Sequence, residues 1–291
     1  MGGDPRSGGL GPARIRLIDA GTDDEAGPVG SLTGGLLDRL RRRDLRATVV
    51  DSRGNSTDTV IFAGTIERAA AGLSRRGTHP GDVIGILAPV SLDRLTAVYT
   101  VMAAGGIALP LELDSDLETL IDILTASDVR LLLVAAPLSE VALELADRSR
   151  VRQVIAFGDA PETTPFGELL LPSPDGSGYD PARGLFHNGL LGYQATDNGV
   201  CTTLSPHDEL LNMFHRFSAS LQLTSDDTVA VGPGMPESVR AVLAALAMWN
   251  GAAVVAPAGG SGQGARGGFS ALDVTVGGCP TPARVGPVHH R

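Results

Sequence analysis

The sequence predicts an α/β protein whose mostly parallel sheets are covered by helices. The first observation is a long alternation of short apolar segments with amphipathic segments, from about residue 32 to 157 and again from 189 to 257. The second is that the short segments are almost continuously apolar, which is typical of strands buried on both faces of a parallel sheet. The third is that aromatic residues make up only 4% of the chain, with Trp249 as its one tryptophan, so Leu, Val, Ile and Ala are expected to form the core.

Helices are expected where apolar residues recur every three or four positions. Ser91 stands where an N-cap is needed, and Gly77 stands where a helix can end in a left-handed turn. The helices predicted on this pattern are 36–45, 63–77, 91–105, 116–127, 139–149, 206–223 and 236–250.

Strands are expected in the short apolar segments that lie between these helices. Gly54 and Asn55 form a turn signal, so two short strands are predicted on either side of them within 47–62. The remaining predicted strands are 83–88, 106–113, 129–135, 151–157, 189–195, 199–205, 227–232 and 252–257.

The predicted organisation has two α/β subdomains. Residues 31–157 form the first and residues 185–257 the second, and a Pro-, Gly- and Ser-rich linker at 158–184 joins them. Residues 1–30 are predicted to be disordered, and 258–291 to be a flexible Gly-rich break followed by a C-terminal remnant.

The chain contains no lysine, and all 23 of its basic side chains are arginine. A P-loop lysine and a Schiff-base lysine are therefore excluded. A coding bias against lysine is the alternative explanation. Such a bias thins lysine at free surface sites, whereas it does not usually remove a lysine that performs chemistry.

Charge and cysteine content narrow the class of protein further. The net charge of −10 argues against nucleic acid as a partner. No leader pattern opens the sequence and no apolar run is long enough to span a membrane, so a cytoplasmic protein is expected.

Cys201 and Cys279 are too few for a disulfide scaffold and are expected to stay reduced. Because Cys201 lies in an apolar strand, its thiol is predicted to be buried.

An arginine run and a small histidine cluster both favour ordinary structural roles. The run is interpreted as the solvated face of a helix whose leucines, Leu36, Leu37, Leu40 and Leu45, point inward, rather than as an anion site. It consists of Arg39, Arg41, Arg42, Arg43 and Arg46. The cluster of His207, Asp208 and His215 lacks the i,i+4 spacing of a zinc site, and its acidic residue suits the start of a helix. No metal site is predicted.

Two long stretches resemble the adenylate-forming superfamily, which includes acyl-coenzyme A synthetases and nonribosomal adenylation domains. The first runs from about Thr59 to Ala135; its segment HPGDVIGILAPVSLDRLTAVYTVMAAGGIALPLELD (79–114) carries the match, and MAAGGIALPLELD is the most specific part. The second runs from about residue 189 to 285; its matching segments begin with SPHDELLNMFHRF at Ser205, continue to WNGAAVVAP at Pro257, and include DVTVGGCPTPARV further on. The resemblance implies two α/β subdomains like the first half of that family's large N-terminal domain.

The phosphate loop of the family is the place where this sequence departs from it. The family pattern is YTSGTTG.PKG, whereas this chain has LLGYQATDNGV at 190–200. The resemblance implies a degenerate nucleotide-binding position here, in which Tyr193, Thr196 and Gly199 are retained and Asn198 replaces the loop lysine. A phosphate cradle needs small residues whose N–H groups converge on the oxygens, and the neighbouring Asp197 adds a repulsive charge.

These matches and departures imply a truncated, non-catalytic homologue of the AMP-forming acyl-activating ligases that acts by binding, with no catalytic residue and no cofactor. ATP and magnesium are implied if the ancestral activity survives. One alternative is a subunit of a genuine acyl-coenzyme A or acyl-adenylate ligase that another chain completes, and another is a decayed gene product. A protein partner or a homo-oligomer is expected, because half of a large domain would expose sheet edges and apolar faces.

Overall fold

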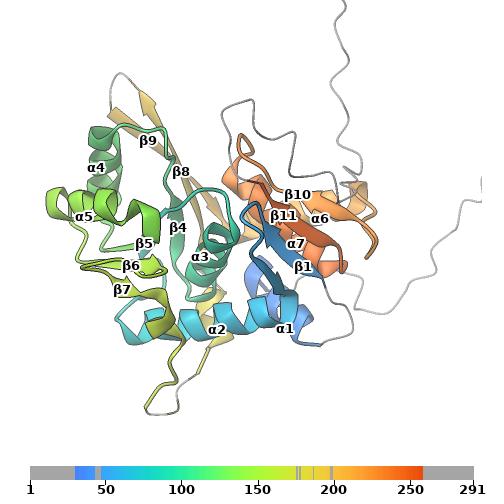
Figure 1. Ribbon diagram of the computed structural model, residues 1–291. Coiled ribbons are helices and arrows are strands. Elements are labelled where there is room, and N and C mark those ends of the chain that lie inside the picture. Colours follow the sequence, from blue (N-terminus) through green and yellow to red (C-terminus); the bar gives the residue numbers. More distant parts are fainter. Residues whose placement is uncertain are drawn as a thin grey trace, which may run out of the picture.

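The computed structural model describes residues 30–42, 47–174, 176, 178–185, 187–196 and 199–257. The predictions for residues 1–29, the C-terminal remnant from 258 onward, the arginines at 43 and 46, and Asn198 lie outside the described residues. Within them the fold is α/β, with two mostly parallel sheets covered by helices, so the predicted fold class is confirmed (Figure 1).

The larger sheet has seven strands in the order β7-β6-β5-β3-β4-β8-β9. All neighbouring pairs are parallel except the last, in which β8 and β9 form an antiparallel hairpin. The strands are β3 (Val83–Leu87), β4 (Ile107–Pro110), β5 (Leu131–Ala135), β6 (Gln153–Phe157), β7 (Thr164–Pro165), β8 (Gly189–Thr196) and β9 (Gly199–Pro206).

Helices cover both faces of this sheet because its strands are apolar on both sides. On β5, Leu131 and Leu133 join the core beneath one pair of helices, and Leu132 and Val134 join the core beneath the other pair. The first pair is α2 (Thr59–Arg75) and α3 (Leu92–Ala103), and the second is α4 (Leu117–Ala126) and α5 (Ser139–Arg148).

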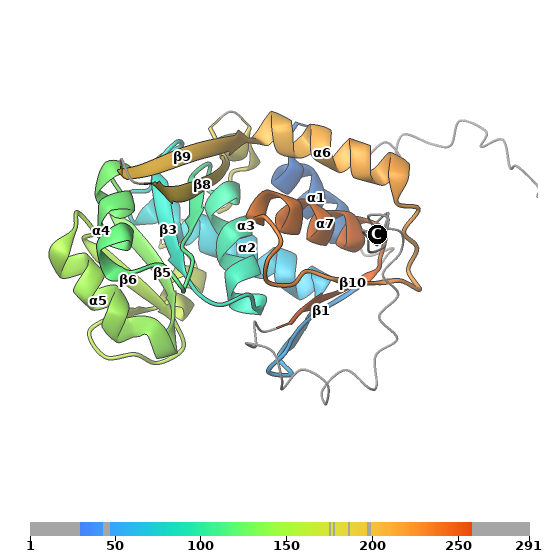
Figure 2. The same cartoon turned by 90° about the horizontal axis from the view of Figure 1, so that it is seen from above.

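The smaller sheet has four strands in the order β10-β11-β1-β2. Its strands are β1 (Thr48–Asp51), β2 (Ser56–Asp58), β10 (Thr228–Ala230) and β11 (Ala253–Ala256), and its helices are α1 (Leu32–Arg41), α6 (His207–Ser220) and α7 (Glu237–Trp249). Figure 2 shows α6 continuing from β9 and lying over α7 and α1. Each sheet takes strands from both sides of the predicted linker at 158–184, so the linker does not separate the two sheets.

Capping side chains set the helix starts. Ser91 Oγ accepts a hydrogen bond from the N–H of Arg94, and Gly77 follows α2 with a φ of +91°, as both were predicted to do. Asp58 caps α2 by accepting from the N–H of Val60. Helix α2 therefore begins at Thr59, four residues before the predicted start, and strand β2 is correspondingly short.

The arginine face of α1 is engaged in ion pairs. Arg41 Nε lies 2.5 Å from Glu67 Oε1, and Arg42 Nη2 lies 3.1 Å from Asp38 Oδ2. On the opposite face Leu36, Leu37 and Leu40 are buried, as the sequence predicted, and Leu45 lies outside the described residues.

Among the described residues, no helix combines the length and apolar character needed to cross a bilayer.

Candidate functional site

A hollow of about 340 Å³ lies at the carboxyl end of β4, where the β8–β9 hairpin faces the start of α7. In open α/β sheets the carboxyl ends of parallel strands are where ligands bind. Pro110 and Glu112 follow β4, Pro236 to Ser238 open α7, and the hairpin contributes the remaining wall with Leu190, Leu191, Gly192, Tyr193, Gln194, Thr203 and Ser205.

The hairpin itself is regular along its whole length. Its register runs from Gly189 opposite Pro206 to Thr196 opposite Gly199, and Thr196 Oγ1 donates to the carbonyl of Gly199 at 2.7 Å. Only two residues, Asp197 and Asn198, join the strands. In an extended strand, successive N–H groups point to opposite sides, so those of β8 and β9 do not converge on one point as a phosphate cradle requires.

Tyr193 ties the hairpin to the loop that follows β4. Its hydroxyl accepts a hydrogen bond from the N–H of Glu112 at 2.9 Å and lies 3.0 Å from Ser115 Oγ. The ring packs on the core beneath α4 together with Val200. Of the predicted nucleotide-binding residues, Tyr193 therefore lies on the hollow, whereas Thr196 and Gly199 lie at the tip of the hairpin and do not line it.

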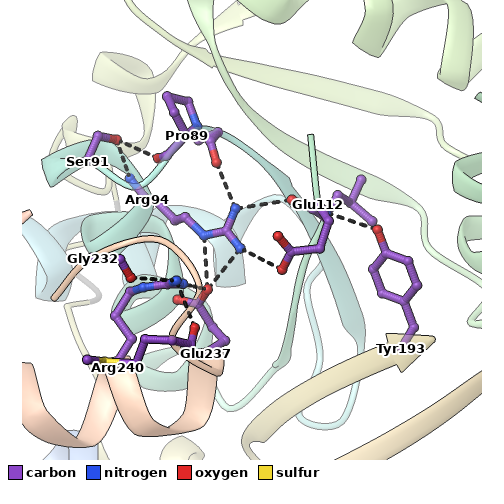
Figure 3. A network of polar contacts seen from close by, with 11 residues as sticks. Pro89, Ser91, Arg94, Glu112, Tyr193, Gly232, Glu237 and Arg240 are labelled. Atoms are coloured by element: carbon purple, nitrogen blue, oxygen red, sulfur yellow. Dashed lines mark hydrogen bonds and ion pairs between the residues drawn. The ribbon is translucent and has the colours of Figure 1, made fainter. Parts of the chain in front are cut away.

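A buried network of charges lies beneath the hollow (Figure 3). The guanidinium of Arg94 donates to Glu237 Oε2 from Nε at 3.0 Å and from Nη2 at 2.8 Å. Its Nη1 donates to the carbonyls of Ala88 and Leu111, which follow β3 and β4. Arg94 thus fastens the carboxyl ends of two strands to the first turn of α7.

Arg240 completes this network from the next turn of α7. It pairs with the same Glu237 oxygen and donates to the carbonyls of Gly232 and Met235. Burial lowers the pKa of Arg240, and the Glu237 carboxylate opposes that shift. Glu112 lies 3.6 Å from Arg94 at the exposed rim, so two guanidinium groups face two carboxylates and the network is neutral.

The charges that line the hollow are acidic. Glu112 and Glu237 form part of its wall, whereas Arg94 and Arg240 do not line it and are only 3% and 4% exposed. An anionic ligand in the hollow would meet the carboxylates first, and the guanidinium groups beneath are already bonded to them. This arrangement disfavours a triphosphate.

The prediction that Cys201 is buried is wrong, because its thiol is exposed. Cys201 pairs with Gln194, and both lie on the opposite hairpin face to Tyr193 and Val200, which pack on the core beneath α4. The physical reason is that β9 is an edge strand, and β8 pairs with β4 only at Gly189 and Leu190, so the rest of the hairpin extends beyond β4 and leaves apolar residues of β9 exposed.

The histidine cluster has the structural role that the sequence predicted. His207 is the first residue of α6, with Asp208 and Glu209 in its first turn, where the helix dipole favours negative charge. No group of three or more metal-ligating side chains occurs within the described ranges.

Residues 44–181 match the family model of AMP-binding enzymes. Part of this chain is an AMP-binding domain. The match includes β3, α3 and β4, which carry the HPGD and MAAGG motifs, and it ends before the β8–β9 hairpin.

The chain is similar in sequence to part of one synthase and in fold to solved structures of ligases. Phenyloxazoline synthase MbtB of Mycobacterium sp. (strain MCS) is 31% identical over 102 residues, which are 33% of this chain and 9% of that protein. A long-chain-fatty-acid-CoA ligase of Archaeoglobus fulgidus superimposes with a TM-score of 0.65 at 17% identity, covering 80% of this chain. Mycobacterium smegmatis MbtA superimposes with a TM-score of 0.63 at 23% identity, covering 78% of this chain.

The chain spans only part of these proteins: 49% of the Archaeoglobus ligase and 44% of MbtA. It is a homologue of adenylate-forming ligases that corresponds to roughly half of their length, and at these identities the solved structures establish the fold alone.

The Arg94–Glu237–Arg240 network is not predicted by the sequence. A signal was present, since Arg94 is the one basic residue in the largely apolar helix LDRLTAVYTVMA, and a buried arginine requires a partner. The partner could not be named, because Glu237 lies 143 positions further along the chain.

Proposed function

We propose that this homologue of the adenylate-forming ligases does not activate carboxylic acids itself and acts by binding another protein. The observation that carries the proposal is the β8–β9 hairpin. At the position of the family's phosphate loop, the chain has two paired strands whose connection is only two residues long.

The charges of the hollow support the same proposal. Phosphoryl transfer needs cations that are already placed where negative charge develops. Here Glu112 and Glu237 line the hollow, the nearby arginines are buried and paired, and the sequence offers no lysine. A magnesium ion could bridge the carboxylates and a triphosphate, so the test must include magnesium.

Two assays on the full chain test the absence of catalysis. Calorimetry with ATP and magnesium is expected to give no saturable heat, and ATP–pyrophosphate exchange with a panel of carboxylic acids is expected to give no turnover. An active acyl-CoA ligase serves as the positive control in both. Saturable ATP binding together with acid-dependent exchange would overturn the proposal.

The exposed edge of the seven-stranded sheet supports binding to a protein. Strand β9 is eight residues long and contains no charged side chain, and none of the described residues pairs with its outer side. Uncharged edge strands pair readily with another chain. Light scattering of the purified chain, alone and after capture of its partner, is expected to show a complex, and Thr203→Pro in β9 is expected to weaken it. A chain that is monomeric and captures nothing would contradict this part of the proposal.

A second function is favoured by the extent of the structural match. Because the chain superimposes on 49% of a long-chain-fatty-acid-CoA ligase, we also consider a ligase subunit that another polypeptide completes. In that case, adding the complementary polypeptide would restore exchange that the chain alone lacks. If the first proposal is correct, neither the chain alone nor the chain with the added polypeptide shows exchange.

A further inference from the structure

A second concave surface lies at the other end of the strands of the seven-stranded sheet, where β3, β5 and β6 begin. It is a groove of about 260 Å³ between the end of α2 and the starts of these strands. We call it the arginine groove, and its lining residues include Arg76, Asp82, Asp128, Arg130, Arg152 and Gln153.

Arg130 and Arg152 lie side by side in this groove. Strands β5 and β6 are parallel, with Leu131 opposite Gln153, so the two arginines immediately before them are neighbours across the sheet. The N–H of Arg152 donates to the carbonyl of Arg130 at 2.8 Å, which fixes this placement. Like charges on neighbouring strands repel each other, so this pair needs negative charge close by.

Asp128 supplies negative charge to Arg130 but not to Arg152. Its Oδ1 lies 2.9 Å from Arg130 Nη2 and 3.1 Å from Arg150 Nη1. The hydrogen bond from Arg150, with the charge of Arg130, holds the pKa of Asp128 below its ordinary value, so the carboxylate is ionised at neutral pH. One carboxylate thus pairs with two guanidinium groups, those of Arg130 and Arg150. The guanidinium group of Arg152 is a third, and Asp128 does not pair with it.

The other charged groups of the arginine groove are already bonded. Arg76 Nη2 lies 2.6 Å from Glu168 Oε2. Asp82 Oδ2 accepts from the N–H of His79 at 2.7 Å and lies 3.8 Å from His79 Nδ1. Across the described residues the exposed guanidinium of Arg152 makes neither a hydrogen bond nor an ion pair, so all five of its donors are available.

We propose that the arginine groove binds a small oxyanion, a phosphate or a carboxylate, with Arg152 as its main ligand and Arg130 beside it. A guanidinium presents two parallel N–H groups that match two oxygens of either anion. The groove and its ion-pair partners contain four arginines and three carboxylates, with Asp82 counted among the latter, so a net charge of +1 remains there although the chain as a whole carries −10. This site lies at the amino-terminal ends of the strands, whereas the hollow lies at the carboxyl end of β4, so the proposal does not depend on whether the chain adenylates acids.

The test is a titration of the full chain with inorganic phosphate and, separately, with acetate and citrate, at constant ionic strength. Saturable binding in the millimolar range is expected. Calorimetry measures it, or the amide chemical shifts of residues 128–131 and 152–153 report it. The anion that binds more tightly identifies the source, a phosphoryl group or a carboxylate.

Variants connect the binding to Arg152. Arg152→Gln is expected to weaken binding at least tenfold, and Arg152→Lys, which keeps the charge but loses the paired donors, to weaken it less. Arg148→Gln is the matched control, because Arg148 is an exposed arginine on α5 that pairs with Glu118 outside the groove. It is expected to bind like the wild type.

Two results would overturn the proposal. One is a wild-type chain that binds none of the three anions saturably, and the other is an Arg152→Gln variant that binds as tightly as Arg148→Gln. Because Arg152 has no side-chain partner within the described part of the chain, its variants are expected to unfold at the wild-type temperature, so a loss of binding reports on the groove itself.

Discussion

The α3–α7 contact and the β8–β9 hairpin lie on two sides of the same hollow and are stabilised by opposite means. In the contact, buried charged groups bond to one another, and Tyr99 on α3 donates a hydrogen bond of 2.5 Å to the carbonyl of Ala241 on α7. The hairpin contains no charged side chain in either strand and depends on its ladder and on Tyr193. The buried guanidinium groups of this region are therefore neutralised inside the protein, and only the carboxylates of Glu112 and Glu237 face a ligand in the hollow.

Removing the shared carboxylate should give the largest effect. Glu237→Gln is expected to lower the free energy of unfolding by about 3–5 kcal/mol, because two buried guanidinium groups lose their common partner. Urea denaturation measures the loss. Glu112→Gln removes the other carboxylate near Arg94 from an exposed position 3.6 Å away, and should cost less than about 1 kcal/mol. Equal losses in the two variants would show that burial does not set the strength of this network.

Two glycines of β8 test how closely the hairpin strands pack. A methyl group on Gly189 would lie 2.6 Å from the carbonyl oxygen of Ser205, whereas one on Gly192 would have 3.8 Å to its nearest neighbour. Gly189→Ala is therefore expected to cost about 1–3 kcal/mol. Gly192→Ala should be neutral or slightly stabilising, and thermal unfolding of the pair distinguishes them. If both substitutions left the unfolding temperature unchanged, the strands near Gly189 would be packed less closely than the 2.6 Å approach indicates.

The hydrogen bonds of the Tyr193 hydroxyl contribute less to the free energy of unfolding. Tyr193→Phe removes the hydroxyl that bonds to the Glu112 N–H and Ser115, and is expected to cost about 1 kcal/mol. Hydrogen exchange should quicken in the hairpin and at residues 112–115, while α3 and α7 keep their protection. Ser115→Ala, which removes one of the two contacts, should lie between the wild type and Tyr193→Phe.

The smallest effect concerns the helix that supports the hairpin from below. Asp116 caps α4 by accepting from the N–H and the hydroxyl of Thr119, and these hydrogen bonds lower its pKa from 3.8. A lowered folded-state pKa stabilises the protein above pH 3.8, and that contribution disappears as the pH falls through the folded value. Asp116→Asn keeps a capping oxygen, so its unfolding temperature should approach that of the wild type as the pH is lowered to 3. A constant difference between the two chains across this range would contradict the assignment.

The sequence predicts the elements of this fold well and their assembly poorly. The apolar runs at β3, β5 and β6 and the N-cap at Ser91 are local signals, and the structure bears them out within a few residues. The pairing of β1 with β11 joins distant segments. It could not be predicted, because the residues of an apolar strand do not specify which distant strand it will pair with. The predicted linker at 158–184 therefore did not mark the division between the sheets.

The candidate site was only partly predictable for the same reason. The departure from a phosphate loop at Tyr193–Gly199 is readable in the sequence, since it depends on adjacent residues. The charges that define the hollow come from residues far apart, with Glu112 after β4 and Glu237 at the start of α7. The exposure of Cys201 depends on β9 being an edge strand, which its own apolar residues do not reveal.

The pairing of β1 with β11 also has a consequence for how the chain is made. Val49 and its partner Val254 are about 200 positions apart, and at ~5–20 residues per second a ribosome needs roughly 10–40 s to produce the second after the first. During that interval the β1–β2 hairpin is outside the ribosome with one open side. The nascent polypeptide must therefore be shielded by a chaperone, or finish translation before it meets another copy.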